Sequence, residues 1–380
     1  LMIIHTSYNM TGSNPLLNDQ QAIKRIFDHI DNNTTDLGDE TWKEPVENYF
    51  SQERFKQEIQ LLRKLPVPFC PSAALPEKGS YVARQASGTP LLTVRGSDGE
   101  VRSFINACRH RGMQVASGSG CKKSFVCPYH GWTYGLKGEN RNIPGSDGFP
   151  GVDPVEHGLK RVSAFEKGGI VYVCQDGEIN KKFLDEALDY FTDEQVLINQ
   201  SGIEDQANWK ILHETLLEGY HIKTLHKDTF YPYGLDNINV VENYGQNSRV
   251  IFPFRRIEKL REVEPASRVI DGTITSVYSL FPNASISVLS KYLIPNHCKL
   301  VALGKPTEKE SKKWFKRYEK HLPKTGELVF FDRSWYTRAL VEATMGYCSK
   351  RQYTYFMKNV IPWEQKQIED GVEFFKFYLS

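Results

Sequence analysis

Two pairs of residues with metal-binding side chains lie close together in the chain. Cys108 and His110 are separated by one residue, Cys127 and His130 by two, and sixteen residues lie between the pairs. Two thiolates can hold one iron ion and two imidazoles a second, which is one ligand set of a [2Fe–2S] cluster. Zinc is the competing metal, because two cysteines and two histidines also suit a tetrahedral zinc site. Zinc fingers place both cysteines before both histidines, whereas each pair here supplies one of each, so we favour the cluster.

These ligands need two tight loops that lie close together. Gly112 and Gly131 follow the two pairs and permit tight backbone turns. Alternating apolar residues and the turns "SDGE" and "LKGE" predict short antiparallel strands around them. We therefore expect a small antiparallel β domain over residues 69–180, with one ligand pair at each of two hairpin tips. Cys121 lies between the pairs, and we expect a small buried thiol there rather than a ligand.

A second group of metal-binding residues follows in "NWKILHETLLEGYHIKTLH". His221 and His226 are separated by four residues, and neutral imidazoles suit Fe(II) when a carboxylate completes the ligand set. A five-residue step does not align two side chains on a regular helix, so we expect the helix to end or distort near residues 222–225.

The remaining patterns predict the elements around these groups. Residues 1–68 have apolar positions at helical spacing in "NDQQAIKRIFDHI" and "ERFKQEIQLLRKL". Residues 181–290 show a helix followed by antiparallel strands, which predicts an α+β domain. Residues 291–380 change style, with two buried strands alternating with helices, which predicts an α/β unit.

The bulk composition is that of an ordinary globular chain. It has 380 residues, of which 40% are hydrophobic and 25% charged, and a net charge of +2 that gives no reason to expect nucleic acid binding. We expect no membrane span, because no run of about 18 apolar residues occurs, and no signal peptide. Seven scattered cysteines favour a reducing, cytoplasmic location. Residues 291–380 carry 17 Lys and Arg against 10 Asp and Glu, while the remainder carries 31 against 36.

From about residue 20 to 290, the sequence resembles the catalytic α subunit of Rieske non-haem iron oxygenases. The motifs "CRHRG" and "CPYHGWTY" carry the likeness, together with the surrounding stretch "LPEKGSYVARQASGTPLLTVRGSDGEVRSFINACRHRG". The resemblance implies a Rieske [2Fe–2S] cluster and a helix-grip-type catalytic domain, here incomplete, that holds a mononuclear Fe(II). It also implies electrons from a reductase or ferredoxin, O2 and a small organic substrate as reactants, and a homotrimer in which a neighbouring subunit supplies the cluster.

The resemblance also assigns roles within the second group. It implies that His221 and His226 bind the mononuclear iron, and that Glu218 is the carboxylate bridging an iron-ligating histidine and a cluster histidine of the neighbour. Glu214 could support the site from behind or be a solvated helix carboxylate, and His213 matches no ligand position. Glu at the bridging position occurs in relatives acting on quaternary ammonium compounds, and four aromatic residues could form a cation-binding face or belong to the core. These aromatic residues are Tyr231, Tyr233, Phe252 and Phe254.

From about residue 291, the sequence instead resembles a fragment of family-2 polyphosphate kinases. The stretch "GELVFFDRSWYTRALVE" carries this likeness, which implies an α/β P-loop-kinase-like fragment, Mg2+ handled by Asp332 and phosphate contacts from Arg333. No G-x-x-x-x-G-K phosphate loop occurs in the chain; the nearest sequence, "GSGCKKS" (118–124), lacks the second Gly-Lys. The oxygenase resemblance implies a third iron ligand in a late "E-D" stretch; Asp370 in "QKQIEDGVEFF" is the candidate, and it lies beyond residue 290, where that resemblance ends. A natural fusion, a misassembled reading frame and an engineered chimera would each explain the joint near Ser290 and Lys291.

Overall fold

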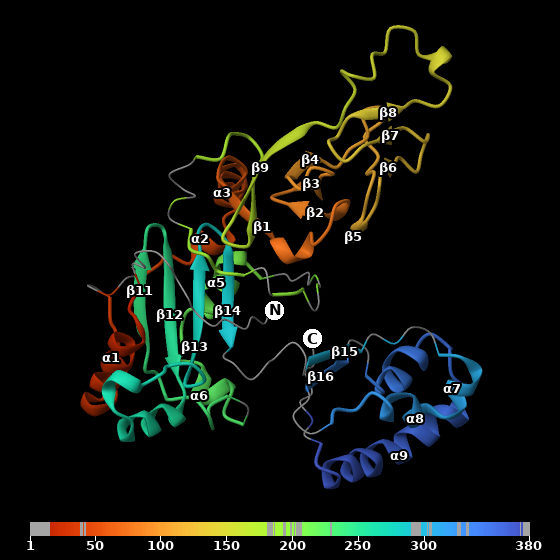
Figure 1. The fold of residues 1–380 in the computed structure, drawn as a ribbon. Coiled ribbons are helices and arrows are strands. Elements are labelled where there is room, and N and C mark those ends of the chain that lie inside the picture. The colour runs from red at the N-terminus through yellow and green to blue at the C-terminus, as the bar shows by residue number, and fades with distance from the viewer. Residues whose placement is uncertain are drawn as a thin grey trace. The chain divides into compact units, whose positions relative to one another are not determined.

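The computed structural model divides the chain into two compact units, Leu1–Tyr292 and Leu293–Ser380 (Figure 1). The residues that it describes are 16–38, 41, 43–180, 185, 187–192, 195–197, 200, 202, 207–228, 230–289, 298–301, 303, 306–324, 328–331, 334–372 and 374. Each unit has a hydrophobic core of its own.

The first unit contains the small antiparallel β domain that the turns and alternation predicted. Seven strands form one sheet in the order β1-β10-β9-β4-β3-β2-β5, and three short strands, β6-β7-β8, form a second (Figure 1). The strands of the larger sheet are β1 (Val67–Pro71), β2 (Ser80–Ala86), β3 (Thr89–Arg95), β4 (Val101–Ile105), β5 (Gly118–Cys121), β9 (Arg161–Lys167) and β10 (Ile170–Cys174). Those of the smaller sheet are β6 (Phe125–Val126), β7 (Thr133–Tyr134) and β8 (Asn140–Asn142). Residues 118–121, the "GSGC" of the stretch that came nearest to a phosphate loop, form the edge strand β5.

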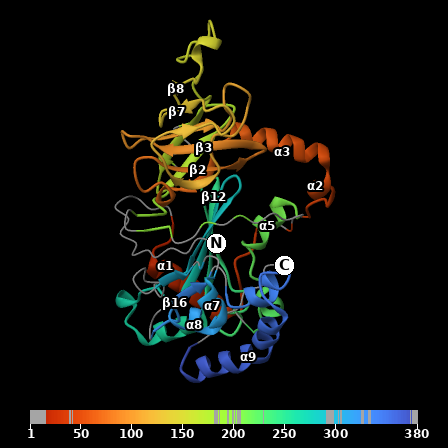
Figure 2. The same ribbon diagram turned by 90° about the vertical axis from the view of Figure 1, so that its right-hand side faces the viewer.

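Helix α3 (Gln52–Lys64) packs against the larger sheet (Figure 2). Its buried Leu62 joins a cluster with Phe69 of β1, Leu91 of β3 and Val171 of β10. Ser51 caps the helix by accepting a hydrogen bond from the backbone N–H of Arg54, at 3.2 Å. The apolar face that the helical periodicity predicted for this segment thus packs on one face of the sheet.

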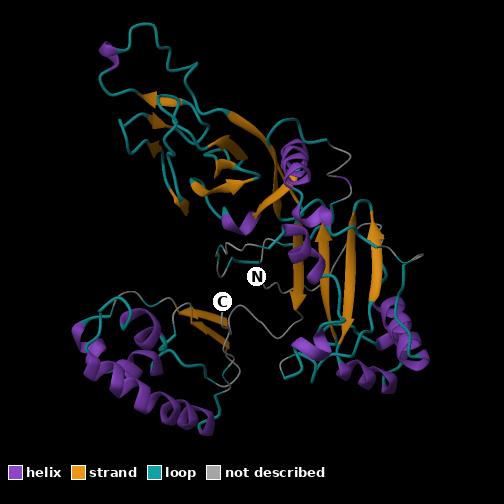
Figure 3. Ribbon diagram, turned by 180° about the vertical axis from the view of Figure 1, so that it is seen from behind, coloured by secondary structure: helices purple, strands orange, loops and turns teal. Residues whose placement is uncertain are grey.

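A second antiparallel sheet of the first unit packs against the turn that holds the candidate mononuclear site. It contains β11 (Val240–Tyr244), β12 (Asn247–Pro253), β13 (Ile274–Leu280) and β14 (Ala284–Leu289) in chain order (Figure 3). Helix α1 (Asp19–Asn32) begins with a capping box between Asn18 and Gln21 and buries Ile23 and Ile26 with Ile251 of this sheet. The remaining short elements are α2 (Glu47–Phe50), η1 (Ser72–Ala74), η2 (Ser146–Gly148), α5 (Trp209–Thr215), α6 (Ile222–Leu225), η3 (Arg255–Glu262) and η4 (Pro265–Ser267).

The helix that carries the second ligand group ends where the spacing predicted, because α6 (Ile222–Leu225) stops at Leu225 and His226 is its C-terminal cap. An earlier departure from helix was not predicted. The departure from helix lies between the end of α5 at Thr215 and the start of α6. His221 and His226 therefore flank a single turn, one at each end.

The second unit has two parallel strands with helices between and after them, as the predicted βαβα order requires. β15 (Cys298–Val301) pairs in parallel with β16 (Leu328–Phe331). The helical segments are α7 (Glu308–Lys312), α8 (Trp314–Glu319), the π-helical η6 (Arg338–Glu342) and α9 (Lys350–Glu369). Its core is mostly aromatic and consists of Trp314, Phe315, Tyr318, Trp335, Phe356, Val360 and Trp363.

Membrane insertion through a helix has no support in the described part of the chain, where every helix is too short or too polar to cross a bilayer.

Candidate functional site

The two predicted cluster loops have the same backbone hydrogen bonds. In the first, the N–H of Gly112 donates to Cys108 O and the N–H of Cys108 donates to Met113 O, both at 2.8 Å. In the second, the N–H of Gly131 donates to Cys127 O at 3.0 Å, and that of Cys127 to Trp132 O at 2.8 Å. Gly112 and Gly131 have φ values of +74° and +75°, a left-handed conformation that glycine adopts without a Cβ penalty. One loop follows β4, and the other joins β6 to β7.

The side chains of these loops are arranged as a cluster would require. Cys108 and Cys127 are 4% and 3% exposed and belong to one core cluster. The rings of His110 and His130 lie 4.6 Å apart between centroids. His110 Nδ1 is buried without a hydrogen-bond partner among the described residues, an arrangement that is costly unless another group satisfies it. Two buried thiols and an unsatisfied imidazole nitrogen fit a metal cluster held between the loops.

Two aromatic residues brace the ligands, and the motif reasoning did not assign roles to them. Trp132 stacks on the His110 ring, with centroids 5.2 Å apart and an interplanar angle of 8°. Tyr134 is fully buried, and its hydroxyl lies 3.2 Å from Cys108 Sγ and accepts the N–H of Arg109 at 2.9 Å. Burial, followed by the contact with Cys108, raises the pKa of Tyr134, so the hydroxyl stays protonated. The only sequence signal for this contact was the proximity of Tyr134 to the second ligand pair.

The expectation for Cys121 was wrong in one respect. Cys121 is exposed in β5 rather than buried, and its Sγ lies 3.5 Å from Lys78 O. All four residues of this edge strand are exposed, so the strand gives the thiol no buried position.

At the second group, Glu218 and the two histidines surround one helical turn. The carboxylate of Glu218 accepts the backbone N–H of Tyr220 at 2.5 Å and that of His221 at 3.2 Å, and it contacts Nδ1 of the His221 ring. The His221 and His226 rings are 5.2 Å apart between centroids. With Nδ1 engaged by the carboxylate, Nε2 of His221 is the nitrogen left for a metal.

Gly219 permits the close packing of this turn on the sheet. A Cβ at Gly219 would lie 3.0 Å from Asn239 Oδ1 and 3.2 Å from the Phe252 ring. Asn239 Oδ1 is buried and has no hydrogen-bond partner in the described part of the chain. Sequence reasoning missed Asn239, because its approach to Gly219 depends on how the turn lies on the sheet.

The Asn-Trp-Lys motif that precedes the turn contacts the N-terminal helices. The side-chain amide of Asn208 donates to Tyr49 O at 2.6 Å. Trp209 Nε1 and Lys210 Nζ both donate to the Glu58 carboxylate, at 3.2 and 2.6 Å. Burial of Glu58 opposes its ionisation, but these hydrogen bonds outweigh burial and lower the pKa of Glu58. The motif therefore ties α5 to α2 and α3.

The neighbouring residues of uncertain role are now placed. His213 has hydrogen-bond partners for both ring nitrogens, Ser279 Oγ at 2.8 Å and Ser285 Oγ at 3.0 Å, and burial lowers its pKa. Glu214 accepts the Tyr49 hydroxyl at 3.0 Å, so its contact is with α2.

The four aromatic residues weighed as a cation-binding face have different surroundings. Phe252 is buried with Val250 and Val277 in the core. Phe254 packs against Phe230, with ring centroids 5.6 Å apart, and Tyr233 is 63% exposed. The guanidinium of Arg255 lies 5.1 Å from the Tyr231 ring centroid. At least one of the four is therefore a core residue.

The remaining predicted residues belong to the second unit or lie outside the described residues. Asp370 follows α9 as its C-terminal cap. Its assignment as the third iron ligand stays a prediction. Asp332 and Arg333 lie outside the described residues, directly after β16. No three His, Cys, Asp or Glu side chains in the described ranges lie close enough together to hold a single metal ion. A Rieske cluster does not need such a group, because each of its irons takes two protein ligands.

Three protein families match successive parts of this chain. Residues 66–163 match the Rieske [2Fe-2S] domain, residues 198–298 the catalytic domain of the ring hydroxylating alpha subunit, and residues 283–380 polyphosphate kinase 2. The last two ranges overlap around the boundary between the two compact units. The chain thus joins segments with two different sets of relatives.

Individual relatives divide in the same way. Glycine betaine monooxygenase oxygenase subunit of Chromohalobacter salexigens is 36% identical over 162 residues, which cover 40% of this chain and 36% of the relative. NDP-polyphosphate phosphotransferase 3 of Ruegeria pomeroyi is 48% identical over 89 residues, which cover 23% of this chain and 30% of the relative. The chain therefore spans about a third of the length of these curated relatives.

Solved structures support the fold of the oxygenase-like part. A quaternary ammonium Rieske monooxygenase in complex with an inhibitor has a TM-score of 0.54 at 20% identity and covers 66% of this chain and 68% of its own. Naphthalene 1,2-dioxygenase from Rhodococcus sp. has a TM-score of 0.52 at 22% identity, with coverages of 72% and 69%.

Proposed function

We propose that this chain, which joins a Rieske domain and a ring-hydroxylating alpha-subunit segment to a polyphosphate kinase 2 segment, is the terminal component of an oxygenase. It takes electrons from a reductase or ferredoxin and uses O2 to hydroxylate or oxidatively dealkylate a small organic substrate. The observation that carries the proposal is the pairing of two equivalent loops, with buried Cys108 and Cys127 and the unsatisfied Nδ1 of His110.

The residues of the two loops have different tasks at the cluster. Cys108 and Cys127, both buried in the core of the domain, would hold one iron. His110 and His130 would hold the other; His130 is exposed and His110 is half-buried. When bound, the cluster supplies electrons one at a time. The exposure of His130 supports the proposed homotrimer, in which a neighbour would receive these electrons.

The second group would hold a mononuclear Fe(II), the group that supplies O2 chemistry when it is bound. His221 and His226 are its proposed ligands, one at each end of α6. Glu218 fixes the His221 ring through Nδ1 and presents Nε2 to the metal. The same carboxylate satisfies two backbone N–H groups, which holds the turn in place before any metal binds.

Small quaternary ammonium compounds are the substrates that we propose to test first. The relatives named glycine betaine monooxygenase support this class, as does Glu rather than Asp at residue 218. Oxidative demethylation inserts one oxygen atom of O2 into an N-methyl C–H bond. Two electrons and two protons reduce the other oxygen atom to water, and the N-hydroxymethyl product then releases formaldehyde.

The decisive experiment combines metal analysis with turnover. Chain purified without oxygen should contain about three irons if both sites fill, and about two if only the cluster forms. O2 uptake and formaldehyde release with glycine betaine, a reductase and NADH would support the oxygenase. A filled cluster with no second iron would instead favour an electron-transfer protein.

A second candidate function is phosphotransfer between polyphosphate and nucleotides. The match of residues 283–380 to polyphosphate kinase 2 favours it, and Mg2+ would be its metal. We expect no nucleotide phosphorylation by this chain, because its sequence has no glycine-rich phosphate loop. Conversion of GDP to GTP with polyphosphate and Mg2+ would show that expectation to be wrong.

A further inference from the structure

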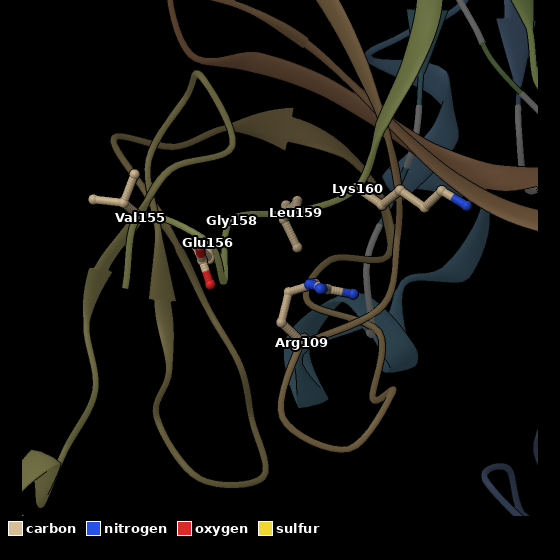
Figure 4. Close-up of a pocket in the computed structure, with 6 residues that line it drawn as sticks. All are labelled: Arg109, Val155, Glu156, Gly158, Leu159 and Lys160. Carbon is tan, nitrogen blue, oxygen red and sulfur yellow. The ribbon is translucent and has the colours of Figure 1, made fainter. Parts of the chain in front are cut away.

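Helix α5, which leads into the turn of the second ligand group, is held by polar contacts more than by burial. None of its seven residues, Trp209–Thr215, is fully buried, and the apolar side chains of Ile211 and Leu212 are 43% and 49% exposed. The cleft beside the first cluster loop, lined by Arg109 and residues of the segment 155–160, does not involve this helix (Figure 4). The position of α5 therefore depends on the hydrogen bonds that its side chains make with other elements.

His213 contributes two contacts between α5 and the second sheet. One ring nitrogen, Nε2, lies 2.8 Å from Ser279 Oγ, and the other, Nδ1, lies 3.0 Å from Ser285 Oγ. Ser279 of β13 and Ser285 of β14 are directly paired in register, so the imidazole joins α5 to two neighbouring strands at one point. Leu217, four residues further on, packs against the buried cluster of the same sheet that contains Phe252.

The imidazole and the two hydroxyls match each other as neutral hydrogen-bonding groups. Burial lowers the pKa of His213, so the ring is neutral at pH 7, with one nitrogen that donates and one that accepts. A serine hydroxyl can do either, so the two serines satisfy both ring tautomers. Because both nitrogens are engaged, the ring cannot rotate without breaking these bonds, and it fixes the distance and direction between α5 and the sheet.

The chain between His213 and the proposed metal ligands is short. Four residues separate His213 from Glu218, whose carboxylate accepts the backbone N–H of His221 and contacts its ring. The turn has little room to shift, because a Cβ at Gly219 would lie only 3.0 Å from Asn239 Oδ1. A change in the position of α5 on the sheet would therefore change the position of the His221 ring.

We infer that His213 is a positioning residue of the mononuclear site: by holding α5 on β13 and β14, it sets the geometry in which His221 and His226 are presented to the metal. This inference rests on the proposed function, because it concerns the metal that these two histidines would hold. Groups that orient metal ligands from behind change the metal affinity by about 10- to 100-fold when they are removed. His213 acts through the backbone of α5 instead of touching a ligand, so we expect an effect near the lower limit.

Binding of Co(II) tests the inference without O2, substrate or turnover. Co(II) binds the same nitrogen and oxygen ligands as Fe(II), and its electron paramagnetic resonance spectrum reports the geometry of those ligands. The full chain is used with its cluster filled and oxidised, a state that gives no signal, and with the mononuclear site emptied by a mild chelator. His213→Ala should weaken Co(II) binding about tenfold and shift the signal of the bound ion.

Variants that keep or remove single hydrogen bonds separate positioning from a general loss of stability. His213→Gln retains a donor and an acceptor, so it should recover part of the affinity that His213→Ala loses. Ser279→Ala and Ser285→Ala should each weaken Co(II) binding, and neither should add to the loss in His213→Ala, because all three act through one contact. These serine variants also serve as the test if His213→Ala does not fold.

The matched control is Ser287→Ala, which removes a hydroxyl of the same strand β14 while both nitrogens of His213 keep their partners. It should leave the Co(II) affinity and signal unchanged. Equal losses in Ser285→Ala and Ser287→Ala would overturn the inference and leave the oxygenase proposal intact. So would a lower melting temperature of His213→Ala with an unchanged Co(II) signal, since that is the mark of a purely structural residue. Failure of the unmodified chain to bind Co(II) would instead reject the mononuclear site itself.

Discussion

Tyr134 places a hydroxyl against one of the four proposed cluster ligands. Its oxygen already accepts the Arg109 N–H, and a ligating thiolate can only accept, so the Tyr134 hydroxyl would donate to Cys108 Sγ. Reduction adds negative charge to the cluster, and hydrogen bonds to its sulfur ligands favour that state.

Tyr134→Phe should therefore lower the reduction potential of the cluster. A loss of about 1 kcal/mol corresponds to about 40 mV for a one-electron couple. A redox titration followed by visible circular dichroism measures the shift. Tyr81→Phe is the control, because Tyr81 belongs to the same core. Its hydroxyl lies 3.4 Å from Ser117 O and not beside a proposed ligand. Equal potentials for the two variants would contradict the role assigned to Tyr134.

Glu218 acts at the residue scale on the second site. Glu218→Ala removes the partner of His221 Nδ1, so the ring loses its orientation and the mononuclear site should bind iron about 10- to 100-fold more weakly. Iron analysis after dialysis against a graded chelator measures this affinity, and the cluster absorbance should not change. Glu214→Ala is the control, since the Glu214 carboxylate contacts Tyr49 instead. An unchanged iron content in Glu218→Ala would remove this residue from the site.

At the scale of elements, local sequence patterns predicted helices and strands better than they predicted the contacts between them. The periodicities of α1 and α3 and the alternation of β2 and β3 located those elements, because each buries one face. The spacing of His221 and His226 predicted the helix end at Leu225, but not the earlier break between Thr215 and α6. That earlier break depends on the Glu218 carboxylate, which accepts the N–H groups ahead of α6.

The candidate site divides in the same physical way. Both Cys-His pairs were predictable, because each pair comes from one short loop and ligand chemistry restricts its residue types. Asn239 was not predictable, because it meets Gly219 only after the sheet and the turn have packed together. Tyr134 lies near the ligands in sequence, but its contact with Cys108 joins two different loops.

The contact between α3 and α5 should make stability depend on pH. The folded-state pKa of Glu58 lies below its ordinary value of 4.5, so the stabilisation from Lys210 is complete above that pH and is lost as pH falls through the lower folded-state value. Melting temperatures between about pH 3 and pH 6 should show the advantage over Glu58→Gln shrinking on acidification. Glu53→Gln, on the same helix, should not reproduce this pattern. A constant gap between the unmodified chain and Glu58→Gln would contradict it.

At the scale of the whole molecule, the two compact units have separate cores and different relatives. The change in strand pattern and charge near residue 290 predicted such a division, since buried parallel strands and a basic composition begin there. The assignment of Asp370 as the third iron ligand stays a prediction, because Asp370 belongs to the second unit and the histidines to the first.

Removal of iron should therefore affect only one of two unfolding events. Calorimetry of the whole chain should show two transitions, and reductive chelation should lower the melting temperature of the first unit, whose ligand loops lose bonds to metal. The transition of the second unit should stay in place. The control is a chain treated with a chelator that has first been saturated with Mg2+. A single transition that shifts as a whole would show that the units are energetically coupled.

The central claim is that the four Cys and His side chains of two loops hold a [2Fe–2S] cluster. The most direct test is electron paramagnetic resonance of chain purified without oxygen, before and after one-electron reduction. We predict a silent oxidised state, a Rieske signal after reduction, and loss of that signal in Cys127→Ser. Zinc in place of iron, or iron without the signal in the reduced chain, would contradict the claim.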